Sequence, residues 1–442
     1  MVAIQYRVQG RTAKQIADSV ESGIRVGALK PDALLPSVRA LAGELEVAAG
    51  TVAAAYRLLR DRGLVEARGR HGTHVRQRPP LAARSGGPLV QVGVIDLASG
   101  QPDPGLLPDL DSVLPLARWG PAAAPSAVVL PQLLALGRDR FAADGVPGAA
   151  MTVASGGLDA IHRLLSAQLR PGDSVAVEDP GWPNVLDLIA ALGLRARPVP
   201  LDSEGPLPEP MRAVLRAGAR AVIITSRAQN PTGVALTHKR ADELRRVLAD
   251  YPHLFVIEDD HAAELVDVPL ATVAGATKSW AFVRSTSKPY GPDLRVATIA
   301  GDDATIARVD GRVRVGSGWV STLLQRLTVE LWTNPQVASV VAHAAQTYAS
   351  RRQQLIEDLA RRGIPATGDT GLNVWVPVID ETSVVAGLLQ AGWAVAPGAR
   401  FRQTSHPGVR ITVSGLTSAT ISTLADHLAT AITVPPPSQY TT

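Results

Sequence analysis

The chain has 442 residues, of which 46% are hydrophobic and 19% charged, with a formal net charge of +4 and no cysteine. This composition is typical of a folded globular protein, and the length exceeds one ordinary core, so we expect at least two domains. The lack of cysteine excludes disulfides and thiolate-bound zinc. We see no apolar leader and no run of membrane-spanning length, and therefore expect a cytoplasmic protein without a membrane partner.

Positive charge is concentrated at the N-terminal end. Residues 1–78 hold 13 Lys and Arg against 7 Asp and Glu, a net charge of +6, so the other 364 residues carry −2. A basic end on a near-neutral remainder is the expected footprint of a module that binds a polyanion such as DNA.

The same end has the element pattern of a winged helix-turn-helix. Apolar spacing predicts helices over 12–27, over 37–45 and from about Thr51 to Arg62, with Ser37 as the cap of the second. Two short strands then flank the basic turn 68–72. In this arrangement the third helix enters the major groove, and the turn presents Arg68 and Arg70 to phosphates or the minor groove.

The segments 35–42, 51–65 and 69–75 together resemble the GntR class of bacterial repressors. The resemblance implies that Ser37, Arg39 and Thr51 contact DNA. Ala48-Ala49 stands where many relatives carry a polar pair such as Ser-Arg, which removes one phosphate or base contact. A three-helix scaffold that has lost DNA binding therefore stays open as an alternative.

A connector is predicted over 77–93, where prolines and glycines interrupt any periodic pattern. It separates a DNA-binding domain over 1–76 from a second domain over 94–435. We expect the second domain to have a large part, about 94–320, and a small C-terminal part, about 321–435.

The sequence of the second domain predicts an α/β fold. Short β-branched runs at 174–178, 221–225, 254–258, 282–285 and 296–300 alternate with helical segments, which predicts a mainly parallel sheet covered by helices on both faces. A long helical stretch should reach about Arg361. Strands at 373–376 and 410–413 and a helix over 417–430 predict a small α+β part.

Candidate ligand groups follow these strands, where ligands of such sheets gather. Ser155-Gly156-Gly157 opens a helix and suits a phosphate. The other candidates are Trp182, which can stack on a flat ring, Asn230 as an amide donor, Asp259 beside His261 as a partner for a protonated pyridine nitrogen, and Ser285, Ser287, Lys288 and Arg295 as a lysine with a phosphate clamp. Taken singly, Trp182 is better explained as a packing residue, and Asp259 can also be a structural carboxylate. Asp259 and His261 could also bind a metal ion, but no matching set of ligands appears elsewhere in the sequence, so we predict no metal site.

In this order the motifs resemble the fold type I pyridoxal 5′-phosphate (PLP) enzymes, the aspartate aminotransferase superfamily, over roughly residues 94–435. The resemblance implies PLP as cofactor, Lys288 as its Schiff-base lysine and Asp259 as partner of the pyridine nitrogen. It assigns the remaining roles as follows: Asn230 and His261 near the ring oxygen, Trp182 on the ring, Ser155, Gly156, Gly157, Ser285, Ser287 and Arg295 on the phosphate, and Arg410 on the carboxylate of a substrate or effector.

Two features depart from that pattern, and a third residue bears on the choice of ligand. His261 stands where many relatives have Tyr, and its titration differs. The segment 117–137 lacks the expected Gly- and Tyr-bearing entry to a helix, for which Arg118 or Trp119 could substitute. Asn184 stands where sensors of ω-amino acids can place an arginine, which argues against a ligand like γ-aminobutyrate.

A GntR-like domain joined to an aminotransferase-like domain resembles the MocR subgroup of bacterial transcription regulators. The resemblance implies a homodimer that binds double-stranded DNA at a roughly two-fold or direct-repeat operator and senses an amino compound or PLP itself. A working aminotransferase with a relic winged helix is the main alternative, because every residue of the PLP chemistry is present. A scaffold in which PLP is purely structural is a third.

Overall fold

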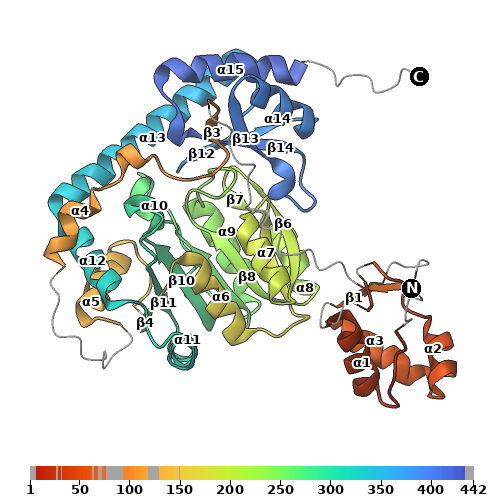
Figure 1. Ribbon diagram of the computed structural model, residues 1–442. Coiled ribbons are helices and arrows are strands. Elements are labelled where there is room, and N and C mark those ends of the chain that lie inside the picture. Colours follow the sequence, from red (N-terminus) through yellow and green to blue (C-terminus); the bar gives the residue numbers. More distant parts are fainter. Residues whose placement is uncertain are drawn as a thin grey trace, which may run out of the picture. The chain divides into compact units, whose positions relative to one another are not determined.

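The computed structural model describes residues 6–25, 28–30, 32–61, 64–67, 72–75, 93–117, 129–148 and 150–433 (Figure 1). Arg68, Arg70, Arg118, Trp119 and nearly all of the predicted connector lie outside these residues. In the part of the chain that is described, we find no helix with the length and apolar character needed to cross a membrane.

The N-terminal elements confirm the predicted winged helix-turn-helix order. They are α1 (Ala13–Arg25), α2 (Val38–Leu45), α3 (Ala49–Asp61), β1 (Val65–Ala67) and β2 (Thr73–Val75). The apolar stripes of the three helices meet in one core, in which Ile16, Leu41 and Leu59 are fully buried. β1 and β2 pair antiparallel, with Val65 opposite Val75, so the two strands of the wing form as predicted.

Two polar contacts fix the start of α2. The Ser37 hydroxyl accepts a hydrogen bond from the backbone N–H of Ala40 at 3.2 Å, which is the geometry of an N-cap. The Tyr56 hydroxyl of α3 donates to the Pro36 carbonyl at 2.7 Å. The turn before α2 is therefore tied both to its own helix and to the helix that would read DNA, and Arg39 lies exposed on the first turn of α2.

The large sheet of the second domain has eight strands in the order β4-β11-β10-β9-β8-β5-β6-β7. These are β4 (Ala150–Ala154), β5 (Ser174–Asp179), β6 (Arg195–Asp202), β7 (Gly205–Pro206), β8 (Ala219–Thr225), β9 (Phe255–Asp259), β10 (Ser279–Ser285) and β11 (Ala297–Gly301). β8, β9 and β10 run parallel, whereas β11 runs antiparallel to both of its neighbours. The sheet is therefore mixed, with a parallel centre.

Helices cover both faces of this sheet, as predicted. They are α5 (Pro131–Ala143), α6 (Gly157–Gln168), α7 (Pro183–Ala191), α8 (Pro208–Arg216), α9 (His238–Ala249) and α11 (Asp303–Val315). Figure 1 shows α6 and α11 side by side over one face, where they contact each other. Val222 and Ile224 of β8 pack with α8 and α9, while the intervening Ile223 points the opposite way, because side chains alternate along a strand.

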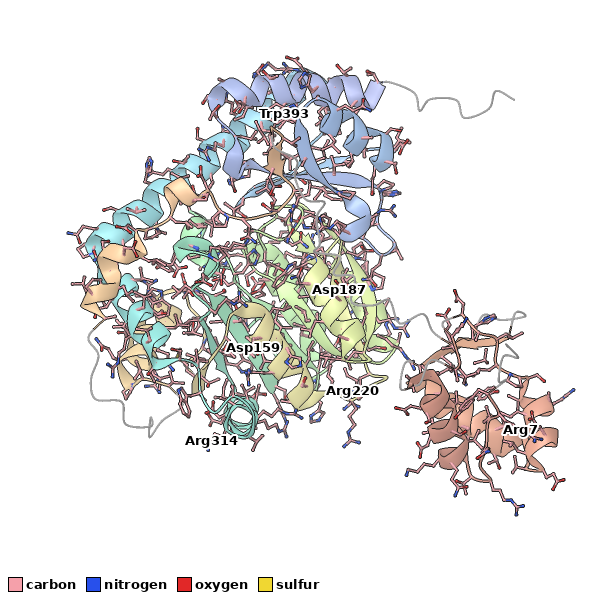
Figure 2. The ribbon with its side chains drawn as sticks, in the orientation of Figure 1. Arg7, Asp159, Asp187, Arg220, Arg314 and Trp393 are labelled. Atoms are coloured by element: carbon pink, nitrogen blue, oxygen red, sulfur yellow. The ribbon has the colours of Figure 1, made fainter. Side chains whose placement is uncertain are left out.

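The small sheet has the order β12-β14-β13-β3. Its strands are β12 (Asn373–Pro377), β13 (Trp393–Pro397), β14 (Gly408–Thr412) and β3 (Ile95–Leu97), with α14 (Glu381–Gln390) and α15 (Ser418–Thr433) against them. β3 corrects the predicted division at about residue 320, because the segment assigned to the start of the large part pairs with β13. Trp393 of β13, labelled in Figure 2, donates its indole N–H to Nδ1 of His427 on α15 at 2.9 Å.

The long helical stretch that should reach Arg361 is two helices, α12 (Thr322–Thr333) and α13 (Pro335–Arg361). The break falls at Pro335, which has no backbone N–H to continue α12. The Asn334 side chain accepts from the backbone N–H groups of Gln336 and Val337 and thereby caps α13. Short elements complete the described chain: α4 (Leu110–Val113), α10 (Ser287–Tyr290) and several single 3₁₀ turns.

Candidate functional site

A cavity of about 290 Å³ lies where the ends of the central strands meet the small sheet. Asp259 ends β9, Ser285 ends β10, Trp182 follows β5 and Asn230 follows β8. The cavity brings together most of the residues that the sequence singled out for the cofactor and effector: Gly157, Trp182, Asn230, Asp259, His261, Ser285, Ser287, Lys288, Arg295 and Arg410. Segments distant in sequence thus converge as the parallel topology requires.

Lys288 supplies the amine of this cavity and is partly buried. Its Nζ atom donates to the carbonyl of Gly100 at 2.5 Å. Burial, with a further contribution from the positive charge of Arg410, lowers the pKa of Lys288 to about 8. A larger fraction of this amine is therefore neutral near pH 7 than for an ordinary lysine, and the neutral amine is the form that attacks a carbonyl.

The two carboxylate oxygens of Asp259 differ, because one has a hydrogen-bond partner and the other has none in the structure. Its Oδ2 atom lies 3.2 Å from Nδ1 of His261, whereas its Oδ1 atom is buried and has no hydrogen-bond partner in the structure. A buried carboxylate oxygen without a donor is costly. A protonated pyridine nitrogen would satisfy it, so this observation fits PLP.

The glycine-rich turn lies beside Arg295 as a phosphate site requires. The Arg295 guanidinium donates to the Ser155 carbonyl at 3.1 Å, and a Cβ atom on Gly156 would lie 2.5 Å from that guanidinium. Only glycine allows this approach, and Gly156 also has a φ of +95°. Ser155 and Gly156 do not themselves line the cavity, and the Ser155 N–H donates to Asp159 of α6, labelled in Figure 2. Gly157 lines the cavity at the N-terminus of α6.

The two serines of the clamp lie beside Gly157. The Ser285 and Ser287 hydroxyls are 3.3 Å apart, and both residues line the cavity. Trp182 and His261 stack with ring centroids 6.4 Å apart and an angle of 30° between the rings. The two rings thus form one aromatic wall, so His261 belongs to a surface that the sequence assigned to Trp182 alone.

Arg410 lies on β14 and is buried. It donates to the Asn230 side-chain oxygen at 3.1 Å and to the Ala98 carbonyl, and its Nε atom has no partner in the structure. Burial and the neighbouring Arg400 lower the pKa of Arg410 to about 9. Asn230 therefore orients Arg410 in this structure, a contact that the sequence did not suggest.

Sequence reasoning missed one wall of the cavity. The loop after β3 contributes Ala98 to Gln101, and the turn after β13 contributes Arg400 and Phe401. The sequence signal for the loop after β3 is a short apolar strand followed by Gly100, whose φ is +69°. The signal for the second was Pro397-Gly398 directly after another apolar run. Asn184, which the sequence singles out only because it replaces an arginine, also lines the cavity.

The fold and this cavity define a class: a fold type I PLP-dependent transferase body that follows a winged helix-turn-helix. Residues 147–428 match the family model of aminotransferase class I and II, and residues 12–75 match that of bacterial regulatory proteins of the gntR family. The chain belongs to the MocR-type regulators of the GntR family, and it is a PLP-dependent DNA-binding transcription regulator.

The similar proteins include regulators and enzymes. The chain is 42% identical to the vitamin B6 salvage pathway transcriptional repressor PtsJ of Salmonella typhimurium, over 96% of this chain and 99% of that protein. It is 24% identical to the HTH-type transcriptional regulator TauR of Rhodobacter capsulatus, over 89% and 90% of the two chains. The structure of kynurenine aminotransferase from Pyrococcus horikoshii superposes with a TM-score of 0.71 over 77% of this chain and 91% of that one, at 20% identity, which shows the fold.

Proposed function

We propose that this chain senses a small amino compound, or PLP itself, in the cavity around Lys288, and that ligand binding there changes how its DNA-binding domains engage an operator. The observation that carries the proposal is the convergence of Lys288, Arg295 and the unpartnered oxygen of Asp259 on one cavity of about 290 Å³. These are the three attachments that PLP needs: an amine, a phosphate site and an acceptor for its ring nitrogen.

PLP supplies an aldehyde and an electron-poor ring. Lys288 would hold it covalently, and its lowered pKa favours that reaction at neutral pH. Asp259 would accept from the ring nitrogen through Oδ1, while Trp182 and His261 form the aromatic wall against which the ring stacks. Asn230 and His261 would lie near the ring oxygen.

The phosphate would take charge-assisted hydrogen bonds from Arg295, hydroxyl donors from Ser285 and Ser287, and the N-terminus of α6 at Gly157, with Ser155 and Gly156 shaping the approach. Arg410 would bind the carboxylate of the effector. Its position is already fixed by Asn230 and Ala98, so little side-chain entropy would be lost on binding.

Sensing requires that the effector bind two states of the protein unequally. An amine that takes the place of Lys288 on the cofactor aldehyde would free the Lys288 amine, which could then donate to the Gly100 carbonyl as it does in this structure. The similarity to a repressor of vitamin B6 salvage supports PLP itself as a second candidate effector. Either ligand changes the same groups at the boundary of the small sheet.

We further propose a cytoplasmic homodimer that binds a two-fold or direct-repeat operator through Ser37, Arg39, Thr51, Arg68 and Arg70. The exposed position of Arg39 on α2 supports a DNA contact. A symmetric dimer presents two identical DNA-binding domains, which fits an operator made of two half-sites.

Two measurements test the proposal. Purified protein incubated with PLP should show visible absorbance that Lys288→Ala abolishes; a colourless wild type would contradict a PLP sensor. The protein should also shift the DNA upstream of its own gene, and Arg39→Ala should weaken that shift. Equal shifts by Arg39→Ala and wild type over a range of salt concentrations would exclude the assigned DNA contact.

A working aminotransferase is the second candidate, and the lowered pKa of Lys288 in a complete site favours it. Turnover would require Lys288 to move protons repeatedly rather than only to hold the cofactor. Sustained transfer of an amino group to a keto acid, together with no DNA binding at low salt, would establish this function instead of the regulator.

A further inference from the structure

A turn of the small part forms one wall of the cavity, and it is hydrogen-bonded to the end of β5 at two points. The turn follows β13 and contributes Phe401 to the cavity. At the first point, the Gly181 N–H donates to the Phe401 carbonyl at 2.9 Å. At the second, Asp179, the buried last residue of β5, accepts hydrogen bonds from residues 403–405. Neither Gly181 nor Asp179 is a ligand of the cofactor or the effector in the proposed function.

Both carboxylate oxygens of Asp179 take part in this contact. Oδ1 accepts from the Gln403 N–H at 2.8 Å and from the Ser405 hydroxyl at 3.0 Å. Oδ2 accepts from the N–H and the hydroxyl of Thr404, each at 2.7 Å, and from the Ser405 N–H at 3.0 Å. Three consecutive backbone N–H groups thus converge on one carboxylate. Hydrogen bonds to a carboxylate are stronger than those between neutral groups, so this joint resists displacement of the turn.

The position of this joint in the chain indicates what it fixes. Trp182 of the aromatic wall lies three residues after Asp179, and Phe401 lies two residues before Gln403. Trp182 and Phe401 both line the cavity. The wall against which the cofactor ring would stack and the turn after β13 are therefore held to each other by the hydrogen bonds of Asp179, and not by side-chain packing alone.

Phe401 carries this constraint to Arg410. The guanidinium carbon of Arg410 lies 4.9 Å from the centroid of the Phe401 ring. The Phe401 ring also meets Trp375 of β12 edge-on, with ring centroids 6.3 Å apart and an angle of 78° between the rings. Phe401 is almost fully buried, and in a close-packed interior the displacement of one side chain is transmitted to its neighbours. A shift of the turn would therefore move the arginine that is the candidate for the effector carboxylate.

From this geometry we propose that Asp179 is a positioning residue for the effector: by binding residues 403–405 it sets Phe401 and Arg410 in place relative to Trp182. An amino acid must reach the cofactor aldehyde with its amine and Arg410 with its carboxylate at the same time, which requires a fixed distance between the two points. The inference rests on the proposed function, because it needs an effector that bears both groups. It assigns Asp179 to recognition of the carboxylate and not to retention of PLP.

A pair of ligands tests the inference in the PLP-loaded full-length protein. L-alanine carries a carboxylate for Arg410, whereas ethylamine is a similar amine without one, and binding of each is followed by the change in visible absorbance. In Asp179→Asn an amide NH₂ group replaces one acceptor and faces the donors of the turn. Loss of a hydrogen bond to a charged acceptor predicts that L-alanine binds this variant about ten- to hundred-fold more weakly than wild type. The affinity for ethylamine and the absorbance of the bound cofactor should be unchanged.

Two further variants sharpen the test. Ser405→Ala removes one hydroxyl donor and keeps the backbone donors, so it should weaken L-alanine binding by less than Asp179→Asn does. It also decides the question if Asp179→Asn does not fold. Asp302→Asn is the matched control, because Asp302 likewise accepts from two backbone N–H groups, those of Trp280 at 2.9 Å and Thr305 at 3.0 Å, but does not line the cavity. It should bind both ligands as wild type does.

Two results would overturn the inference while the proposed function stands. One is an equal loss for L-alanine and ethylamine in Asp179→Asn, or no loss for either, because Asp179 would then not act through the carboxylate. The other is equal binding of the two ligands, or binding of neither, by a wild type that keeps its cofactor absorbance. A wild type without cofactor absorbance would instead refute the proposed function, and the inference with it.

Discussion

Nδ1 of His261 lies 3.2 Å from Oδ2 of Asp259, on the opposite side of the carboxylate from the oxygen that has no partner. A histidine two residues after the aspartate thus fixes the orientation of the carboxylate and directs its free oxygen. The same histidine ring stacks on Trp182. The orientation of the Asp259 carboxylate and the shape of the aromatic wall therefore both depend on the His261 side chain.

Replacing Asp259 should weaken cofactor binding. Asp259→Asn keeps the size of the side chain but removes the charge that pairs with a protonated ring nitrogen, so we expect the Kd for PLP to rise about ten- to hundred-fold. Titration of the cofactor-free protein with PLP measures this change. Asp242→Asn, exposed on α9, is the matched control. An unchanged Kd in Asp259→Asn would show that Asp259 is structural.

The rate at which PLP attaches to Lys288 should depend on pH with a midpoint of about 8. Below that pH the buried amine is protonated and cannot attack; above it the neutral amine predominates. Because Arg410 contributes to the lowered pKa, Arg410→Gln should move the midpoint upward, toward the ordinary value of 10.5. Burial is the larger cause, so the midpoint should remain well below 10.5.

The measurement is the initial rate of the absorbance change after cofactor-free protein is mixed with PLP at a series of pH values. Arg220→Gln should leave the midpoint where it is in wild type. A wild-type midpoint near 10.5 would mean that Lys288 is solvated in the cofactor-free protein.

Stability should depend on pH through Glu178, a buried residue of β5. Burial raises its pKa from 4.5 to about 7, although Thr225 and Gln229 donate hydrogen bonds to it. Between these two pH values the folded state binds more protons than the unfolded state, so stability from this residue falls as pH rises from about 4.5 to about 7.

Glu178→Gln cannot titrate, so it should gain stability relative to wild type between pH 5 and pH 8. Melting temperatures of both proteins at the two pH values give the comparison. Glu357→Gln, exposed on α13, controls for the loss of one carboxylate and should show no such gain. A constant difference between Glu178→Gln and wild type at both pH values would mean that Glu178 is ionised throughout.

Ser37→Ala and Arg39→Ala should differ in their effect on the stability of the N-terminal helices. Ser37→Ala removes the cap of α2 and should cost about 1 kcal/mol in the stability of the N-terminal helices. Arg39→Ala should leave stability unchanged and reduce the salt dependence of operator binding by about one unit of slope. Thermal unfolding and fluorescence anisotropy at several salt concentrations measure the two effects. Loss of stability in Arg39→Ala would assign it a structural role.

The elements that the sequence predicted best are those with strong local signals. Ser37 caps α2 because its hydroxyl can reach Ala40, and the strands that end at Asp259 and Ser285 contain the buried apolar runs Phe255–Ile257 and Trp280–Val283. The break at Pro335 was missed although proline marks it, because the apolar period continues on both sides. β3 was misplaced because its partner, β13, lies about 300 residues further along the chain, and no local pattern encodes such a pairing.

The residues of the site also differ in how well the sequence predicts their place in the cavity. Asp259 ends β9 and Lys288 lies three residues after β10, so the parallel topology brings them to the same edge of the sheet, while Arg295 lies just before β11. Arg400 and Gly100 come from the small sheet and its long-range partner, so their place in the cavity depends on that non-local pairing. The contact between Asn230 and Arg410 joins residues 180 positions apart and has no sequence signature.

Along the chain, β3 lies between the predicted connector and a residue that lines the cavity. The strand begins at Ile95, immediately after the segment that the sequence marks as the connector, and Gly100, which accepts the hydrogen bond from Lys288, lies three residues beyond its end. Chemistry at the lysine and the point where the polypeptide departs toward the DNA-binding domain are thus separated by one short strand.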